Sequence, residues 1–294
     1  MADQAERLRQ ISRQSGIAGT SVGNQQPCRV VAVSSGKGGV GKTSLVVNLS
    51  LVLIQWNYEV VIIDADLGLA NVDVLINAVP RWSLADVIDG TKEIQDIMIY
   101  GPQRLKVVPG GSGFMNLANL DHDNRNQLID RFRALEYEGN FMFIDTGAGI
   151  SRNVLSFIAA ADEFIIITTP EPTALTDAYG MIKVVTENNY KRRINVVVNL
   201  IRDMHQGQEV FDRLDSVSRR YLPQAELNYL GGILYDPVVS RSIEECRPFV
   251  LSFPRSGASQ AVSKIAKRFI QQDKAITAPR GVRSFLSRLA SLIK

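Results

Sequence analysis

The chain has 294 residues, of which 45% are hydrophobic and 21% are charged, as in folded globular proteins. This length suits one large α/β domain or two small ones. Cys28 and Cys246 form no CxxC pair, which argues against a disulfide framework, a zinc site or an iron–sulfur centre within one chain. No stretch approaches the roughly 18 apolar residues of a spanning helix, and "MADQAERLRQ" lacks the apolar core of a secretory signal, so we expect a cytoplasmic protein.

The formal net charge of +3 is unevenly distributed along the chain. Residues 264–294 carry eight Lys or Arg and one acid, a local charge of +7, which leaves −4 for the rest. A basic tail on a mildly acidic body indicates an anionic partner for the tail, either phospholipid or nucleic acid.

Four segments follow one another along the chain. Residues 1–27 combine a short helical pattern, "DQAERLRQI", with a linker rich in Gly, Ser, Asn and Gln. Residues 28–272 have the pattern of a folded domain. Residues 273–281, which include "TAPRG", form a second linker before a final short helix over 282–294.

Continuously apolar runs of strand length recur through the domain, as expected for strands that are covered on both faces. They are residues 29–35, 59–64, 104–110, 140–145, 163–169, 194–200 and 230–235. Helical stretches separate most of them, for example 41–56, 121–136, 173–188 and 207–222. Alternation of strand and helix predicts one α/β domain with a doubly wound, mostly parallel sheet and helices on both sides.

The first strand runs directly into "GKGGVGKT" (36–43), which satisfies G-x-x-x-x-G-K-[ST], and an apolar helix follows. Glycines allow backbone N–H groups to surround phosphate oxygens, and the helix N-terminus adds positive potential. Lys42 is expected to bind the β- and γ-phosphates, and Thr43 to hold Mg²⁺. The predicted nucleotide contacts here are Gly36, Lys37, Gly38, Gly39, Val40, Gly41, Lys42, Thr43 and Ser44.

Acidic residues stand at the ends of two later strands. Asp64 and Asp66 belong to "VVIIDADLGLANVD", and Asp145 belongs to "MFIDTGAG". In an open parallel sheet the ligand lies outside the carboxyl ends of the strands, so these acids should converge on the phosphate loop. There they can bind Mg²⁺ or orient an attacking water. A single strand-end Asp is equally explained as a helix N-cap, but three beside a phosphate loop favour a functional role.

The loop with its second, early lysine resembles the deviant phosphate loop of the MinD/ParA class of dimerising P-loop ATPases, and the two acidic segments resemble its switch regions. The resemblance implies an ATP- and Mg²⁺-dependent homodimer in which Lys37 reaches the partner's nucleotide. It also implies that Asp66 positions the water and that Thr43, Asp64 and Asp145 lie on the metal side. Without a partner, Lys37 would be an ordinary solvated lysine. A group supplied in trans makes hydrolysis depend on assembly.

Two further segments resemble the base-binding parts of the same class. In "VVNLIRD" the resemblance assigns adenine recognition to Asn199, and in "GGILYDPVV" it places Asp236 and Pro237 beside the base. "ILYDP" departs from the Ile-Pro-Tyr-Asp often found there, which changes a residue next to the base but removes no group that the phosphates need.

Within that class, "LADVIDG", "VVPGGSG", "EPTALTDAYGMIK" and "FPRSGAS" resemble the FlhG (FleN) family of flagellar-number regulators. "DQAERLR" matches the DQAxxLR element of that family, which implies stimulation of the GTPase FlhF and makes flagellar switch (C-ring) proteins further candidate partners. The element's residues are Asp3, Gln4, Ala5, Leu8 and Arg9. The alternative is a disordered tail with a chance helical turn.

The final segment, "VRSFLSRLASLIK", has an apolar stripe at helical spacing, formed by Val282, Phe285, Leu286, Leu289, Leu292 and Ile293. Thirteen residues span only about 20 Å, too short to cross a bilayer. An interfacial helix on an anionic membrane fits both the stripe and the tail charge, which predicts peripheral association with the inner face of the cell membrane. Docking of the helix on the protein's own core is the alternative, and both can hold in turn.

The working hypothesis is an ATP-driven membrane switch that regulates flagellar number and placement. A ParA-type DNA-partition ATPase is one rival, although phosphate binding by the tail would need no apolar stripe, so DNA is not the expected partner. A nucleotide-binding scaffold without catalysis is another. An iron–sulfur carrier is disfavoured by the two distant cysteines, unless Cys246 of two subunits meet.

Overall fold

A computed structural model of the chain describes residues 27–66, 71–110, 113, 130–272 and 280–292. Its strands form one eight-stranded sheet in the order β3-β4-β2-β5-β1-β6-β7-β8, in which only the β3–β4 pair is antiparallel. The strands are β1 (Arg29–Ser35), β2 (Val60–Ala65), β3 (Ile99–Tyr100), β4 (Lys106–Pro109), β5 (Phe141–Ala148), β6 (Glu163–Thr168), β7 (Arg193–Ile201) and β8 (Glu226–Leu234). The predicted doubly wound, mostly parallel sheet is therefore confirmed.

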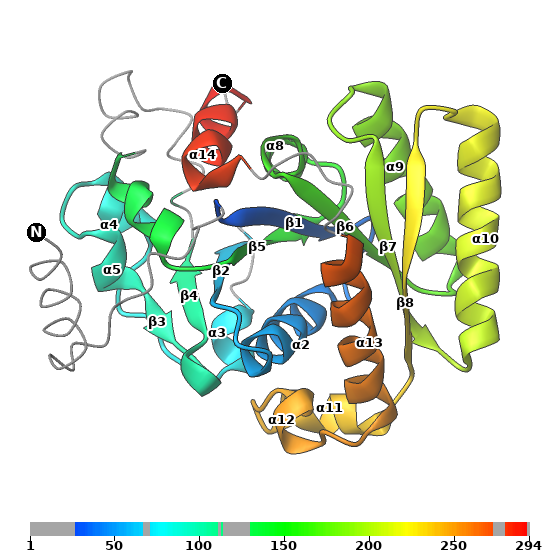
Figure 1. Cartoon of the computed structure of the whole chain (residues 1–294), viewed down its shortest axis with the longest axis horizontal. Coiled ribbons are helices and arrows are strands. Elements are labelled where there is room, and N and C mark those ends of the chain that lie inside the picture. The colour runs from blue at the N-terminus through cyan, green and yellow to red at the C-terminus, as the bar shows by residue number, and fades with distance from the viewer. Residues whose placement is uncertain (1–26, 67–70, 111–112, 114–129, 273–279, 293–294) are drawn as a thin grey trace, which may run out of the picture.

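Helices cover both faces of this sheet (Figure 1). The longer ones are α2 (Lys42–Gln55), α8 (Arg152–Ala160), α9 (Pro172–Glu187), α10 (Met204–Tyr221), α11 (Pro237–Glu244), α13 (Gly257–Gln271) and α14 (Gly281–Leu292). Short ones are α3 (Val72–Leu75), α4 (Leu84–Ile88), α5 (Ile94–Ile97), α12 (Phe249–Ser252) and the 3₁₀ turns η1 (Pro102–Arg104) and η3 (Arg133–Tyr137). No helix within the described ranges is both long and apolar enough to cross a membrane.

Alternate residues of each central strand enter two separate hydrophobic cores. Val30 and Ala32 of β1 join the core beneath α8, α9, α10 and α14, whereas Val31 and Val33 join the core beneath α2, α12 and α13. In Figure 1, α8 and α14 lie above β1, and α2 and α13 lie below it. Burial on both faces explains why these strands are apolar throughout.

All seven predicted strands are present, with shifted ends. The first coincides with β1, but β8 begins at Glu226, four residues before the predicted 230, because polar Glu226 and Asn228 interrupt the apolar run and its first four residues are exposed or only partly buried. The two-residue β3 carries too little pattern to be predicted. Only residues 130–136 of the predicted helix 121–136 are described, and most of them form η3.

The last helix, α14, packs on α8, η3 and the start of β1. Its stripe residues Val282, Phe285, Leu286 and Leu289 are buried, and Leu292 packs against the same core. The Arg283 amide donates to Glu136 at 3.2 Å. The docked alternative therefore describes this structure, and it removes the apolar stripe from the surface.

Several sequence predictions fall outside the described residues. These are the N-terminal element with Asp3, Gln4, Ala5, Leu8 and Arg9, the linker residues 273–279 and the stripe residue Ile293.

Candidate functional site

The phosphate loop joins the end of β1 to the start of α2 and is shaped by two of its glycines. A Cβ on Gly36 would collide with the backbone of α9 at Asp177 and Ala178. Gly41 has φ +89°, and a Cβ there would meet the Asn199 amide. By contrast, nothing lies within 4 Å of a Cβ built on Gly38 or Gly39. The loop is held at both ends and open in the middle, as a phosphate cradle requires.

Asn199, at the end of β7, supports this loop directly. Its side-chain Nδ2 donates to the Val40 carbonyl at 2.8 Å. The loop is thereby tied to a strand 159 residues further along the chain. Adenine recognition by Asn199 stays a prediction.

Lys42 and Asp145 form a buried ion pair beneath the loop. Lys42 Nζ lies 2.6 Å from Asp145 Oδ1, and the two side chains are 8% and 0% exposed. Lys42 Nζ also donates to the Thr43 hydroxyl at 3.4 Å. Burial raises the pKa of Asp145, and the charge of Lys42 opposes that rise. Three predicted residues thus meet in one low-dielectric cluster.

The remaining oxygen of Asp145, Oδ2, is buried and has no hydrogen-bond partner among the described residues. A buried carboxylate oxygen without a partner is costly, so its position indicates a ligand site. Together with the Thr43 hydroxyl it offers the oxygen ligands that Mg²⁺ prefers. No cluster of three His, Cys, Asp or Glu is found in the described part of the chain, but Mg²⁺ usually takes one or two carboxylates and completes its shell with water and phosphate. The residues present fit the ion.

Asp64 lies opposite Asp145 in the register of β2 and β5. Its Oδ1 accepts from the Asp66 amide at 3.2 Å, and its Oδ2 accepts from the amides of Asn71 and Val72 at 3.1 and 3.2 Å. Burial, reinforced by the charge of Asp145, raises the pKa of Asp64 to about 6 despite these amides. Asp64 therefore binds the backbone at the start of α3, although the N-cap residue of that helix is Asn71 and not Asp64. Its role as a metal ligand stays a prediction.

Asp66 follows β2 and reaches toward the neighbouring strand β5. A Cβ on Gly147 would lie 3.5 Å from Asp66 Oδ1. The charge of Asp66 also contributes to the raised pKa of Asp145, after the larger effect of burial. Asp64, Asp66 and Asp145 thus converge at one end of the sheet, as the sequence predicts.

Lys37 occupies a different environment from Lys42. It is 39% exposed, and its Nζ donates to Glu171 Oε1 at 2.6 Å and to Thr173 Oγ1 at 3.1 Å. Glu171 immediately precedes α9, and its hydrogen bond from Lys37 lowers its pKa. Neither Glu171 nor Thr173 was predicted to take part in the site. The sequence feature that could have identified them is an acid and a hydroxyl on either side of Pro172, at the N-terminus of a helix.

Asp236 and Pro237 open α11 beyond the last strand. Asp236 Oδ1 accepts from the Val238 amide and Oδ2 accepts from the Ala258 amide, each at 3.2 Å. One carboxylate therefore caps α11 and fixes the start of α13. The assignment of this pair to the adenine base stays a prediction.

Comparison with known proteins gives one family and two informative relatives. The protein family described as AAA domain matches residues 28–198. The chain is 39% identical to the antiactivator FleN of Pseudomonas aeruginosa over 247 residues, 84% of this chain and 88% of that protein. It is 31% identical to the flagellum site-determining protein YlxH of Helicobacter pylori over 274 residues, 90% of this chain and 91% of that protein.

Solved structures share the fold at lower identity. The septum site-determining protein MinD of Pyrococcus horikoshii, complexed with Mg-ADP, has a TM-score of 0.66 and 24% identity, covering 84% of this chain and 97% of that one. MinD in the MinC:MinD complex of Aquifex aeolicus also has a TM-score of 0.66 and 24% identity, covering 83% and 96%. These structures support the architecture described above.

Proposed function

The chain belongs to the MinD/ParA-type ATPases of the AAA-domain family, together with FleN and YlxH, and from this premise we propose that it hydrolyses ATP to regulate flagellar number and placement. The observation that carries the catalytic part is the buried cluster of Lys42, Thr43 and Asp145 beneath the open middle of the phosphate loop. MinD of Pyrococcus horikoshii, which has the same fold, is complexed with Mg-ADP, which supports nucleotide and Mg²⁺ as the ligands.

Each residue of the cluster has a role that its chemistry explains. The loop amides and Lys42 hold the phosphates, and Thr43 and Asp145 hold Mg²⁺. The ion, when bound, neutralises charge on the phosphate oxygens. Asp66, near β5, orients the attacking water and accepts its proton. Asp145 stays paired with Lys42 and so keeps the lysine inside the site.

Lys37 makes the activity depend on a homodimer. Its side chain is exposed and its partner Glu171 is more than half exposed, so this contact is weak and exchangeable. Lys37 can therefore leave Glu171 and bind phosphate oxygens across a two-fold interface. An added positive charge there stabilises the transition state of phosphoryl transfer.

The C-terminal helix links the nucleotide state to a membrane. In the docked form described here, α14 hides its apolar stripe. When released, the stripe and the basic tail would bind an anionic bilayer surface, placing the protein at the inner face of the cell membrane. The N-terminal element of Asp3, Gln4, Ala5, Leu8 and Arg9 would engage the FlhF GTPase, and flagellar switch proteins are further partners.

The catalytic proposal is tested by the Asp66→Asn variant of the full chain, with phosphate release and nucleotide affinity measured together. Loss of the water-orienting group should lower the rate of ATP hydrolysis at least 100-fold while the affinity for ATP changes less than threefold. Asp89→Asn, at an exposed acid outside the site, is the matched control and should behave as the unmodified chain. An unmodified protein that binds ATP without releasing phosphate would establish the scaffold alternative.

The dimer is tested by light scattering with ATP in the Asp66→Asn background, where hydrolysis is blocked. We expect a dimer with Lys37 present and a monomer that still binds ATP after Lys37→Ala. A dimer of equal stability in both proteins contradicts a role for Lys37 in trans. Sedimentation with anionic vesicles, compared between ATP and ADP, tests the membrane step.

A further inference from the structure

A cavity of about 750 Å³ opens at the end of the sheet opposite the phosphate loop. It lies where β6, β7 and β8 begin, at Glu163, Arg193 and Glu226, whereas the loop follows the carboxyl end of β1. Because β1 and β6 are parallel neighbours, the two sites are separated by the length of the strands. The cavity is therefore independent of the nucleotide site.

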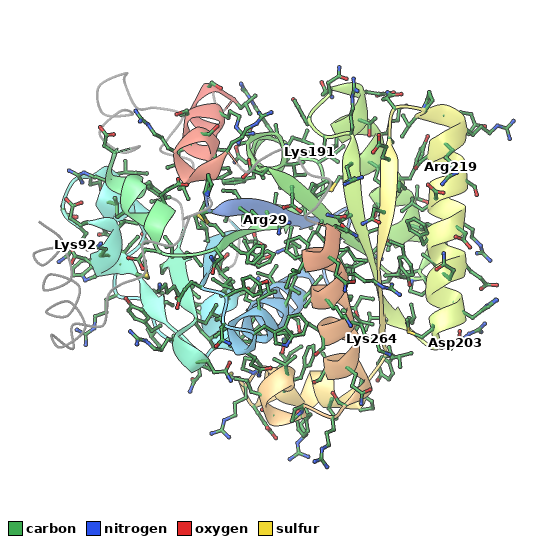
Figure 2. All side chains as sticks on the ribbon, in the orientation of Figure 1. Arg29, Lys92, Lys191, Asp203, Arg219 and Lys264 are labelled. Carbon is green, nitrogen blue, oxygen red and sulfur yellow. The ribbon has the colours of Figure 1, made fainter. Side chains whose placement is uncertain are left out.

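Basic side chains from two separate parts of the chain line this cavity. They are Lys191 and Arg192 of the turn after α9, Arg193 at the start of β7, Arg280 immediately before α14 and Arg288 within α14. Figure 2 shows Lys191 close to α8, in the upper part of the view where α14 also lies. Residues distant in the sequence thus bring positive charge to one concave surface.

Each acid that lines the cavity already has a cation. Asp162 binds Arg288 at 3.1 Å, and Glu226 lies 4.0 Å from Arg193. Glu163 binds Arg29, outside the cavity, at 2.6 Å. Lys191, Arg192 and Arg280 consequently have no salt bridge within the described part of the chain, which leaves the cavity with an excess of positive charge.

Lys191 shows the effect of this excess. Its Nζ donates to the carbonyls of Ala159 and Ala161 at 3.2 and 2.6 Å, so it is fixed in place. Burial, together with the positive charges of Arg288 and Arg280, lowers its pKa to about 8 against the opposing charge of Asp162. A bound anion would relieve this repulsion, whereas water alone does not neutralise it.

We propose that this cavity, between the turn after α9 and the tail helix α14, binds a phosphate-bearing anion through Lys191, Arg192 and Arg280. Arginine side chains present planar sets of N–H donors that match phosphate oxygens, and a group with two negative charges suits several unpaired cations better than one carboxylate does. Arg288 and the adjacent Ser291 belong to α14, so the ligand would also contact the tail helix. The phosphate can come from a soluble compound or from a phospholipid headgroup.

The test replaces Arg192 and Arg280 together, because both are exposed and neither side chain has a hydrogen bond or salt bridge within the described part of the chain. Glutamine keeps the backbone amide with which Arg280 donates to Asp162, so the fold should be unaffected. Arg192→Gln/Arg280→Gln is compared with the unmodified chain and with Arg213→Gln/Arg255→Gln, which removes the same charge from exposed positions elsewhere. Inorganic pyrophosphate is titrated calorimetrically into each full chain, in excess ADP without added Mg²⁺. Any pyrophosphate that still binds the phosphate loop does so equally in all three proteins, so this test does not depend on the ATPase proposal.

We expect pyrophosphate affinity to fall at least tenfold in the cavity variant and to stay within twofold in the control. Equal affinity in the three proteins, or no binding in any of them, overturns the proposal. Sedimentation with phosphatidylglycerol vesicles then identifies the source of the phosphate. A parallel loss of vesicle binding in the cavity variant alone indicates a lipid headgroup, and unchanged vesicle binding indicates a soluble phosphate compound.

Discussion

The two ends of the sheet differ in how their charged side chains are paired. At the carboxyl end, Lys42 is matched by Asp145 in a buried pair beneath the phosphate loop. At the amino end, cations outnumber the available acids, and Arg192 and Arg280 stay exposed. A buried charge must be compensated within the chain, whereas exposed cations are solvated by water and stay free to bind an external anion. The carboxyl end thus has its buried charge matched within the chain, whereas the amino end has a surplus of positive charge that only an external anion would match.

Removing Lys42 should give the largest effect on stability. Lys42→Met leaves Asp145 buried without its cation, and breaking a buried pair in this way costs about 3–5 kcal/mol. Urea unfolding of the nucleotide-free protein measures the loss. Lys37→Met, in the same loop but exposed, should leave the free energy of unfolding unchanged. Lys42→Met/Asp145→Asn should recover part of the loss, and no recovery would mean that the pair is not what stabilises this end.

The lowered pKa of Lys191 predicts that the free energy of unfolding rises at alkaline pH. Its pKa is about 8 in the folded protein and 10.5 in the unfolded chain, so the unfolded chain binds more protons between these values. The free energy of unfolding should therefore increase from pH 8 to pH 10.5, by about 3 kcal/mol from this group. Lys191→Met should lose that increase, and Lys183→Met, at an exposed lysine of α9, should keep it. An identical pH dependence in all three proteins would show that Lys191 is not desolvated.

The raised pKa of Asp64 predicts that the free energy of unfolding falls as the pH rises through the acidic range. Its pKa of about 6 in the folded protein exceeds the ordinary value of 3.8, so the folded protein binds more protons between the two. The stabilisation is complete below pH 3.8 and is lost as the pH rises through 6, a change of about 3 kcal/mol. Asp64→Asn should remove this decrease in the free energy of unfolding, and Asp89→Asn should keep it. Unfolding curves at pH 4, 5, 6 and 7 measure it, and equal slopes would contradict the raised pKa.

The sequence predicts the parts of this molecule that depend on local pattern. Continuous apolar runs mark seven of the eight strands, and the glycine spacing locates the phosphate loop because both signals act over a few neighbouring residues. The convergence of Asp64, Asp66 and Asp145 also follows, since parallel strands end at one edge.

Contacts between distant residues could not be predicted in the same way. Lys37 and Glu171 are 134 residues apart, and their meeting depends on how α9 packs against Gly36. The basic cavity joins Lys191 and Arg192 to Arg280, and of these only Arg280 belongs to the basic tail that the sequence marks out. The amphipathic pattern of residues 282–294 fits docking and membrane binding equally, because both bury the same stripe.

The smallest predicted effect concerns how firmly α14 is attached to the amino end. Arg288 binds Asp162, but it is 25% exposed, and Asp162 also accepts from the Val30 amide, so Asp162 keeps a partner when Arg288 is removed. Arg288→Gln should therefore weaken docking of α14 by about 1 kcal/mol. The rate of amide hydrogen exchange within α14 should then rise about fivefold, while the rate in α2 is unchanged. Arg283→Gln is the control, since Arg283 is exposed and its hydrogen bond to the body is made by its backbone amide, which glutamine keeps. If α14 and α2 exchange in step in every protein, the helix opens only with the whole domain, and release of the tail would require global unfolding rather than a switch.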